Sequence, residues 1–291
     1  MMRELGPRLG GALALGWLGV LAVAVLLGRW LGSGTDAALS QSRLAAASAA
    51  ELLAWWALAA QNTVGLVLVA TLAAALVGVA LGAASAYGDG GLTGLALRLV
   101  EFVGAVPGLI LIGILRLGDP SGGVLGMLVT LVVLRTLEVA QLVRAHVLAV
   151  LPSDFVEASR AFGASRRWQL RVHILPRVVQ PLGVNLLLGA GTLVGLEAAL
   201  SFTGLGLPSR VPSWGGGLAV LARGGGSGGA LACIVCSIGA SSAAFYGLAV
   251  LLERRQRRAA AAPHPEPPGA SGAWRQGASA LNGPDEASAG H

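Results

Sequence analysis

The sequence contains no lysine, because all 20 of its basic residues are arginine. This absence excludes a Schiff-base mechanism and a P-loop, whose lysine reaches the nucleotide phosphates. Charged residues make up only 12% of the chain, against about a quarter in soluble proteins. The only two cysteines, Cys233 and Cys236, lie in an apolar run with no partner pair. We therefore expect buried free thiols there rather than a zinc or redox site.

Apolar residues, by contrast, make up 55% of the chain, to which 44 glycines are added, and the mean hydropathy is +0.73. Such a composition predicts an all-α integral membrane protein whose main solvent is lipid. A helix needs about 20 apolar residues to cross the hydrocarbon core. Six stretches are close to this length, and they predict about six transmembrane helices: 9–28, 63–87, 99–115, 122–147, 178–203 and 229–252.

The distribution of arginine predicts the orientation of these spans, because short arginine-rich loops stay in the cytoplasm. With the N-terminus inside, fourteen arginines fall in cytoplasmic segments and five in external ones. We therefore expect six spans with both termini cytoplasmic. The excess of basic residues also predicts contact with membrane lipid and no nucleic-acid binding. The first run is either a retained anchor, which its length favours, or a signal peptide.

The composition divides the chain into three parts. Residues 1–61 hold an N-terminal transmembrane anchor and an external loop. Residues 62–253 form a core transmembrane domain with a cytoplasmic loop at 151–176. Residues 254–291 form a cytoplasmic tail rich in Pro, Ala, Gly and Ser, which we predict to be disordered because it has little apolar surface to bury.

A capping box is expected in the external loop, where Ser48 and Glu51 have the required spacing. The pair precedes the apolar residues around Trp55 and Trp56. Because Glu51 and Gln61 bracket too few apolar residues for a span, we expect a short separate helix here. Its paired tryptophans predict a position at the external membrane interface.

The cytoplasmic loop 151–176 has the pattern of two short helices. Asp154 is expected to cap the first helix, and Gly163 to end it in the left-handed conformation. Glu157 and Arg160 have i,i+3 spacing, which permits an ion pair on one face. The second helix is expected to begin near Ser165 and to stop before Pro176. From these residues alone the loop is either a protein-docking site or an amphipathic helix that rests on lipid.

Several of these residues resemble the conserved loop and flanking motifs of ABC importer permeases of the dipeptide/oligopeptide type. The resemblance extends over about residues 63–252. Two departures are Ser159, where the motif has alanine, and Arg135 to Glu138, where a Trp-Pro pair is common. Before the second span only Gly34-Thr35-Asp36 is similar to the usual stretch. The matching residues are Glu157-Ala158-Ser159, Gly163, Ile174-Leu175-Pro176, residues 200–206, Pro212 to Gly215, Leu142-Val143-Arg144, Arg98 to Glu101, and Pro107.

The resemblance implies a type I ABC importer permease of the bacterial inner membrane, which is a transport subunit and not an enzyme. It implies a heterodimer with a second permease subunit, two ABC ATPase subunits that bind ATP and Mg, and an extracytoplasmic substrate-binding protein. Residues 154–162 would form the coupling helix, and Gly163 would set its angle. The residues expected to contact the ATPase are Asp154, Phe155, Glu157, Ala158, Ser159, Arg160, Ala161, Phe162 and Gly163.

Ionisable residues inside the predicted spans need partners or water, because each costs about 2.5 to 3.5 kcal/mol at a helix centre. Arg135 and Glu138 either neutralise each other or form a substrate site. Glu197 has no charged neighbour in sequence, so we expect it to face the translocation pathway or the partner permease. Asn185 and Ser201 are further pathway candidates, although a hydrogen bond between helices is the more ordinary role for either.

No metal site is expected, because His146 and His173 have no second ligand at metal-binding spacing. Pro107 predicts a kink in the third span. Two other functions stay open at this point. One is a permease of another ABC importer subfamily, for metal or another solute, and the other is a secondary transporter, although the sequence shows no internal repeat.

Overall fold

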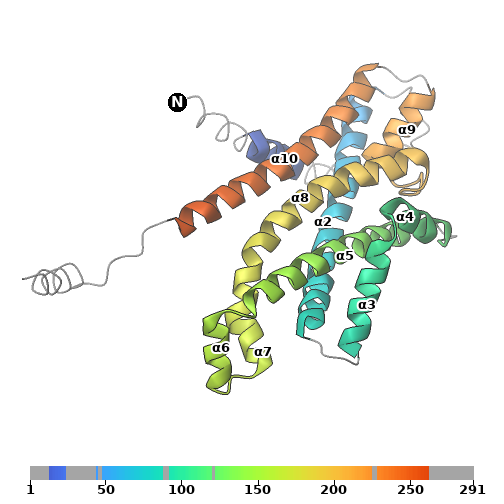
Figure 1. Cartoon of the computed structure of the whole chain (residues 1–291). Coiled ribbons are helices and arrows are strands. Elements are labelled where there is room, and N and C mark those ends of the chain that lie inside the picture. The colour runs from blue at the N-terminus through green and yellow to red at the C-terminus, as the bar shows by residue number, and fades with distance from the viewer. Residues whose placement is uncertain are drawn as a thin grey trace, which may run out of the picture. The chain divides into compact units, whose positions relative to one another are not determined.

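The computed structural model of the chain describes residues 13–23, 44, 48–87, 92–119, 122–224 and 228–261. Their regular structure is entirely helical (Figure 1). The chain divides after Arg254 into two units, and the sites described below lie in the first. The motif Gly34 to Asp36 and tail residues 262–291 lie outside the described residues. The helices are Leu13–Val23, α2 (Ala49–Tyr87), α3 (Leu92–Ala105), α4 (Gly108–Leu117), α5 (Val124–Val150), α6 (Asp154–Ala161), α7 (Arg166–Gln169), a π-helix (Leu170–Ile174), α8 (Leu175–Thr203), α9 (Trp214–Gly224) and α10 (Gly228–Ala260).

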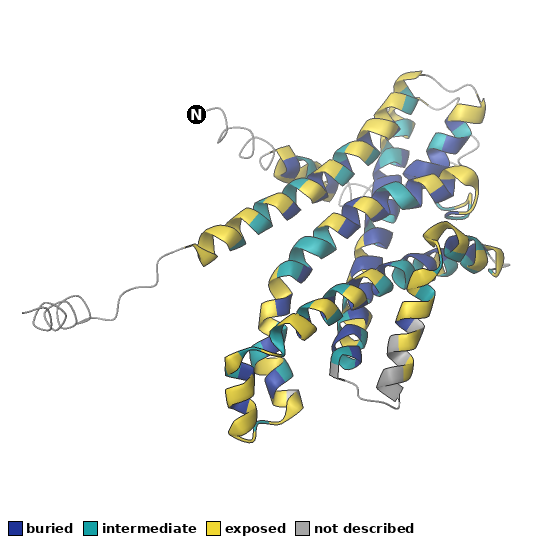
Figure 2. Ribbon diagram, in the orientation of Figure 1, coloured by how far each residue is buried: buried dark blue, intermediate teal, exposed yellow. Residues whose placement is uncertain are grey.

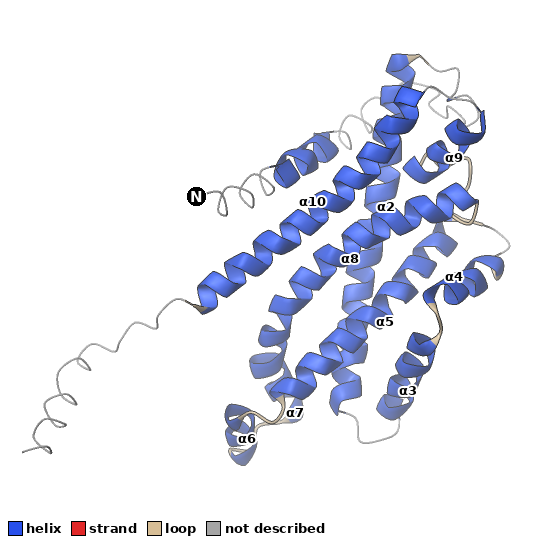
Figure 3. Ribbon diagram, turned by 45° about the horizontal axis from the view of Figure 1, so that its top comes forward, coloured by secondary structure: helices blue, strands red, loops and turns tan. Residues whose placement is uncertain are grey.

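Four of these helices are long and apolar enough to cross a membrane, and they include the second, fourth, fifth and sixth predicted spans. They are α2, α5, α8 with the π-helix before it, and α10 (Figure 3). Of the first predicted span, only Leu13–Val23 is described, and it is helical. The third predicted span is divided into α3 and α4. Pro107 occupies the N-cap position of α4, so it ends one helix and starts the next, and the expectation of a kink within one helix was wrong.

Helix α2 begins at the predicted capping box. The backbone N–H of Ser48 donates to the Glu51 carboxylate at 2.7 Å, and the backbone N–H of Glu51 donates to the Ser48 hydroxyl at 3.4 Å. The helix then continues for 39 residues, which corresponds to about 58 Å. The prediction of a short separate helix before the second span was therefore wrong. The apolar segment around Trp55 continues into the span with no helix breaker between them.

Helix α2 packs along α5 through two glycines one turn apart, Gly78 and Gly82. A Cβ atom at Gly82 would lie 2.5 Å from the backbone oxygen of Ala140 and 2.8 Å from the Val143 Cβ. A Cβ atom at Gly78 would lie 2.7 Å from the Val139 Cβ. Small residues of this kind let two membrane helices approach closely. The buried faces in Figure 2 follow this contact, because Val139 and Val143 are fully buried in it.

Substituting Gly82 by alanine is expected to destabilise the fold, because the added methyl group meets the backbone of α5. Overpacking of this kind costs about 1–3 kcal/mol. Gly65→Ala on the same helix is the matched control, since a Cβ atom there meets nothing within 4 Å. The midpoint of thermal unfolding of the detergent-solubilised protein is expected to fall for Gly82→Ala only. Equal midpoints for the two variants would contradict the close approach of α2 and α5.

Candidate functional site

Helix α6, in the loop 151–176, ends in a complete Schellman motif. Gly163 has a φ angle of +81°, which confirms the predicted left-handed conformation. The backbone N–H of Gly163 donates to Arg160 O, and that of Ala164 donates to Ser159 O, both at 3.0 Å. The start of the helix differs from the prediction. Ser153 occupies the N-cap position and Asp154 lies in the first turn, so Asp154 does not cap the helix, although its charge suits the helix dipole.

The predicted contact residues of α6 fall into two groups, one buried against this chain and one exposed. Val156 and Ser159 are buried and Phe155 is half-buried. Ser159 and Phe155 were expected to contact the partner, yet they face the rest of this chain. Phe162 is 92% exposed, more than any other large apolar side chain in the part of the chain that the structure describes. The remaining predicted contact residues are exposed as well: Asp154, Glu157, Ala158, Arg160, Ala161 and Gly163.

Among the described residues, Glu157 and Arg160 do not form an ion pair with each other, although their i,i+3 spacing permits one. Both lie on the exposed side of α6. An exposed intrahelical pair contributes only about 0.3–0.5 kcal/mol, so little stability is lost when it does not form. The two charges are therefore open to a partner protein.

An aromatic cluster attaches α6 to the beginning of α8. The Arg177 guanidinium lies 4.0 Å from the centre of the Phe155 ring. The edge of His173 meets Phe155 at 5.6 Å and Trp168 at 5.0 Å between ring centres. Cation–π and edge-to-face contacts of this geometry contribute about 0.5–1.5 kcal/mol each. Movement of α6 is therefore expected to move the base of α8 with it.

The second helix of the loop does not stop before Pro176, and that prediction was wrong. Helix α7 passes into the π-helix Leu170–Ile174 and then directly into α8. Pro176 lies in the first turn of α8, where a proline needs no N–H partner and its fixed φ angle suits the helix. Helix α7, the π-helix and α8 thus form one continuous helical segment, whereas α6 is separated from it by the turn at Gly163.

A buried arginine near the middle of α5 joins this helix to α8. Arg135 is 3% exposed, and it forms the predicted ion pair with Glu138. Its Nη2 atom also donates to the Asn185 backbone oxygen and, at 2.6 Å, to Asn185 Oδ1. Gly189 leaves room for the guanidinium, since a Cβ atom there would overlap it. Asn185 therefore makes the hydrogen bond between helices that was one of its two predicted roles.

A second polar cluster surrounds Glu197 near the other end of α8. The Ser201 hydroxyl donates to Glu197 Oε1 at 2.7 Å and accepts from the Leu207 backbone N–H at 3.1 Å. The hydroxyl groups of Thr63 and Ser213 lie beside the carboxyl group. Glu197, Thr63 and Ser213 are all fully buried. Glu197 therefore points into this chain and not to its surface, which differs from the expected position facing the pathway or a partner.

Arg116 holds the loop that follows α8, a role that the sequence did not predict. Its Nε atom donates to Leu205 O at 2.6 Å and its Nη2 atom to Gly206 O at 2.9 Å. Its Nη1 atom pairs with Asp119 at 3.2 Å. The i,i+3 spacing of Arg116 and Asp119 was the one available signal in the sequence. The carbonyl groups of Leu205 and Gly206 belong to a distant segment, so no pattern in the sequence indicates that Arg116 binds them.

Substituting Arg116 by alanine is expected to destabilise this loop, because it leaves two carbonyl groups without their donor. An unsatisfied buried group costs about 1–3 kcal/mol. Arg223→Ala is the matched control, since the exposed Arg223 donates to a carbonyl of the same region, Phe202 O, at 3.2 Å. Limited proteolysis of the loop in detergent is expected to become faster for Arg116→Ala and to stay unchanged for Arg223→Ala. Equal rates would show that the buried arginine does not hold the loop.

The sequence interpretation also missed α9, which closes the same end of the molecule. Ser213 caps it, since its hydroxyl accepts from the Gly216 backbone N–H at 3.1 Å. The Trp214 side chain is fully buried and lies 6.0 Å from Trp56 between ring centres. Trp55 is also buried. Trp55 thus belongs to the protein core, whereas Trp56 is half-buried beside it.

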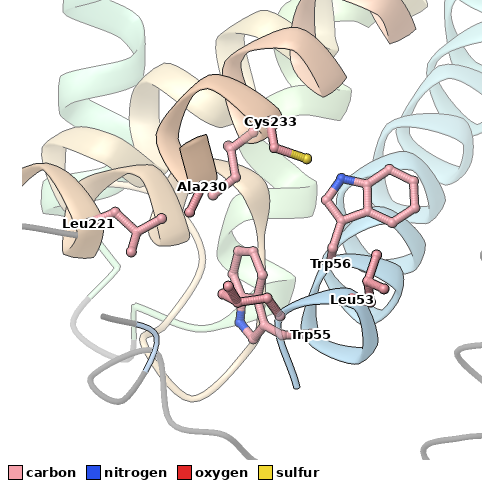
Figure 4. Close-up of a pocket in the computed structure, with 8 residues that line it drawn as sticks. Leu53, Trp55, Trp56, Leu221, Ala230 and Cys233 are labelled. Carbon is pink, nitrogen blue, oxygen red and sulfur yellow. The ribbon is translucent and has the colours of Figure 1, made fainter. Parts of the chain in front are cut away.

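An apolar recess lies between α2, α9 and α10 (Figure 4). Trp55 and Trp56 line it from one side, and Cys233 and Ala230 from another (Figure 4). Both Cys233 and Cys236 are free and exposed, so the expectation of buried thiols was wrong. The eight lining residues carry no ionisable acid or base other than the Cys233 thiol: Leu52, Leu53, Trp55, Trp56, Leu221, Ala230, Cys233 and Ile234.

Four helices that are long and apolar enough to cross a membrane, together with the exposed helix α6 in the loop between two of them, are the features of a multi-pass helical membrane protein. Residues 77–258 match the family described as binding-protein-dependent transport system inner membrane component. Because this match covers more than half of the chain, the protein belongs to that family. The matched residues include the whole cytoplasmic loop and the Glu197 cluster from α8 onward.

Similar curated proteins are permeases. The chain is 30% identical over 140 residues to the oligopeptide transport system permease protein OppC of Bacillus subtilis, covering 48% of this chain and 46% of the relative. It is 37% identical over 120 residues to a probable peptide ABC transporter permease protein of Sinorhizobium fredii, covering 41% and 40%. It is 32% identical over 129 residues to the glutathione transport system permease protein GsiD of Escherichia coli, covering 44% and 42%. The aligned region thus spans less than half of each relative.

Proposed function

We propose that this chain is one of two permease subunits of an ABC importer of the bacterial inner membrane, and that it forms half of a pathway for peptides or a related small solute. The observation that carries the proposal is the exposed surface of α6, held at a fixed angle by the Schellman motif at Gly163, in a member of this transport family. The substrate class follows from the relatives, whose names specify oligopeptides, peptides and glutathione.

Other subunits supply what this chain lacks. The absence of lysine excludes a P-loop, so ATP and Mg belong to two ATPase subunits. The exposed charges of Glu157 and Arg160 and the exposed ring of Phe162 are the proposed contacts with one of them. A second permease completes the pathway as a heterodimer, and an external binding protein delivers the substrate. Both termini of the chain lie in the cytoplasm.

The transport step is a rigid-body movement and not a covalent reaction. When the ATPase subunits close on ATP, they displace α6. The contacts of Phe155 with Arg177 and His173 transmit that displacement to the base of α8. Because α8 carries Asn185 and Glu197 further along, the movement reaches the buried polar clusters. The pathway then opens toward the outside and accepts the substrate.

Co-purification tests this proposal. The tagged chain is expressed in its native host, extracted in mild detergent and purified, with the associated proteins identified and ATPase activity measured. ABC ATPase subunits and a second permease are expected with the wild type. Glu157→Arg is expected to reduce the ATPase subunits about tenfold, since a like charge at an interface costs more than 1 kcal/mol.

The control variant is Arg210→Glu, which reverses an exposed charge in the loop between α8 and α9 and leaves α6 unchanged. It is expected to retain the ATPase subunits. A wild-type preparation without any ABC ATPase, or equal losses in the two variants, would refute the proposal.

A further inference from the structure

A polar strip on the outer surface of α5 carries a further inference. Glu138 lies at the middle of this 27-residue helix, and its side chain is 63% exposed. Gln141 and Ala145 follow at helical spacing on the same face, and both are exposed. The name polar strip is used below for these three residues, of which Glu138 and Gln141 are polar and Ala145 is small.

The outer face of α2 provides a contrast within the same protein. Its exposed residues between positions 66 and 80 are all apolar, which suits direct contact with lipid tails. They include Leu68, Val69, Leu72, Leu76 and Val77. An exposed carboxylate halfway along α5 does not suit such a contact, because a charge at a helix centre costs about 2.5–3.5 kcal/mol on insertion scales.

The partner of Glu138 does not remove this cost. Arg135 is buried and binds the carboxylate through Nη1 alone, while its Nη2 atom is directed to Asn185. The pair is therefore asymmetric, with its positive member inside the protein and its negative member at the surface. Gln141 adds a second exposed polar group on this face, and its amide lies over Gly104 of α3, where a Cβ atom would be 2.5 Å from Nε2.

We infer that the polar strip of α5 lines a water-filled passage through the membrane, and that the exposed Glu138 carboxylate makes this passage favour solutes with a positively charged amino group. A free peptide carries such a group at its N-terminus. The inference rests on the proposed function, and it assigns to that function a particular face of this chain. Arg135 and Asn185 act as positioning residues, because they hold the Glu138 carboxylate at the surface.

Cysteine labelling in native membranes tests the inference. The starting variant carries Cys233→Ala and Cys236→Ala, because both natural cysteines are exposed. Gln141→Cys and Ala145→Cys are then introduced separately, and both leave the Arg135–Glu138 pair intact. Leu72→Cys and Leu76→Cys on α2 are the controls. The probes are two membrane-impermeant methanethiosulfonates, one with a trimethylammonium group and one with a sulfonate group.

Labelling is expected to be about tenfold faster at positions 141 and 145 than at positions 72 and 76, because the reactive thiolate forms only where water reaches it. At position 141 the cationic probe is expected to react about three- to tenfold faster than the anionic one after correction for their rates with free thiol. Adding Glu138→Gln is expected to abolish this preference. The amide still accepts a hydrogen bond from Arg135, so the fold is retained.

The outcomes separate this inference from the proposed function. Slow labelling at both 141 and 145, in preparations that still contain ATPase subunits, would overturn the passage alone and would show that the second permease or lipid covers the strip. Fast labelling without charge preference would overturn the role of Glu138. Absence of ATPase subunits from the same preparations would instead refute the proposed function.

Discussion

Gly163→Pro is expected to abolish the coupling between ATP hydrolysis and transport. Proline fixes φ near −65°, whereas Gly163 has a φ angle of +81°. The substitution also removes the N–H that donates to Arg160 O. The end of α6 must then unwind, and the exposed surface around Phe162 changes direction. In purified complexes, substrate-stimulated ATPase activity is expected to fall at least about tenfold, the equivalent of about 1.4 kcal/mol in coupling.

Gly163→Asn is the matched control, because asparagine adopts the left-handed conformation more readily than other residues with a side chain. It retains the backbone N–H as well. This variant is expected to keep most of the wild-type activity. Full activity in Gly163→Pro, with the ATPase subunits still bound, would show that the angle of α6 is not important.

Arg135→Leu is expected to be the most destabilising single substitution inside the membrane. It removes the donor that joins Glu138 on α5 to Asn185 on α8. Removal of one member of a buried ion pair costs about 3–5 kcal/mol, although the exposure of Glu138 places this case at the lower end. The thermal midpoint in detergent and the yield of folded protein are both expected to fall.

The double variant Arg135→Leu, Glu138→Leu distinguishes the contribution of the ion pair to stability from the contributions of its two side chains. It leaves no unpaired carboxylate, so it is expected to recover part of the stability that Arg135→Leu loses. It is not expected to recover transport, because the exposed carboxylate is absent. If the loss of stability in the double variant equals the sum of the losses in Arg135→Leu and Glu138→Leu, the two side chains do not interact.

Local signals in the sequence predicted local structure well. The capping box of Ser48 and Glu51 involves residues three positions apart, and its hydrogen bonds form as expected. The left-handed Gly163 and the pairing of Arg135 with Glu138 are equally short-range. In each case the interacting groups are neighbours in sequence, so the spacing alone contained the information.

Contacts between distant segments could not be predicted in this way. Nothing around Arg116 indicates that its partners are backbone oxygens about 90 residues away. The burial of Glu197 likewise depends on hydroxyl groups from α2 and from the start of α9. The position of Phe155 beneath Arg177 depends on how the loop folds back. These features arise from tertiary packing, which the order of residue types along one helix does not contain.

Because α7 and the π-helix run directly into α8, this helix can act as a lever. Helix α8 has 29 residues, which gives it a length of about 43 Å. A tilt of roughly 10° at the end that follows the π-helix, with the helix acting as a stiff rod, moves the other end by about 7 Å. An ångström-scale displacement at α6 is thus amplified at the far end of α8, where Ser201 lies and where the loop held by Arg116 begins.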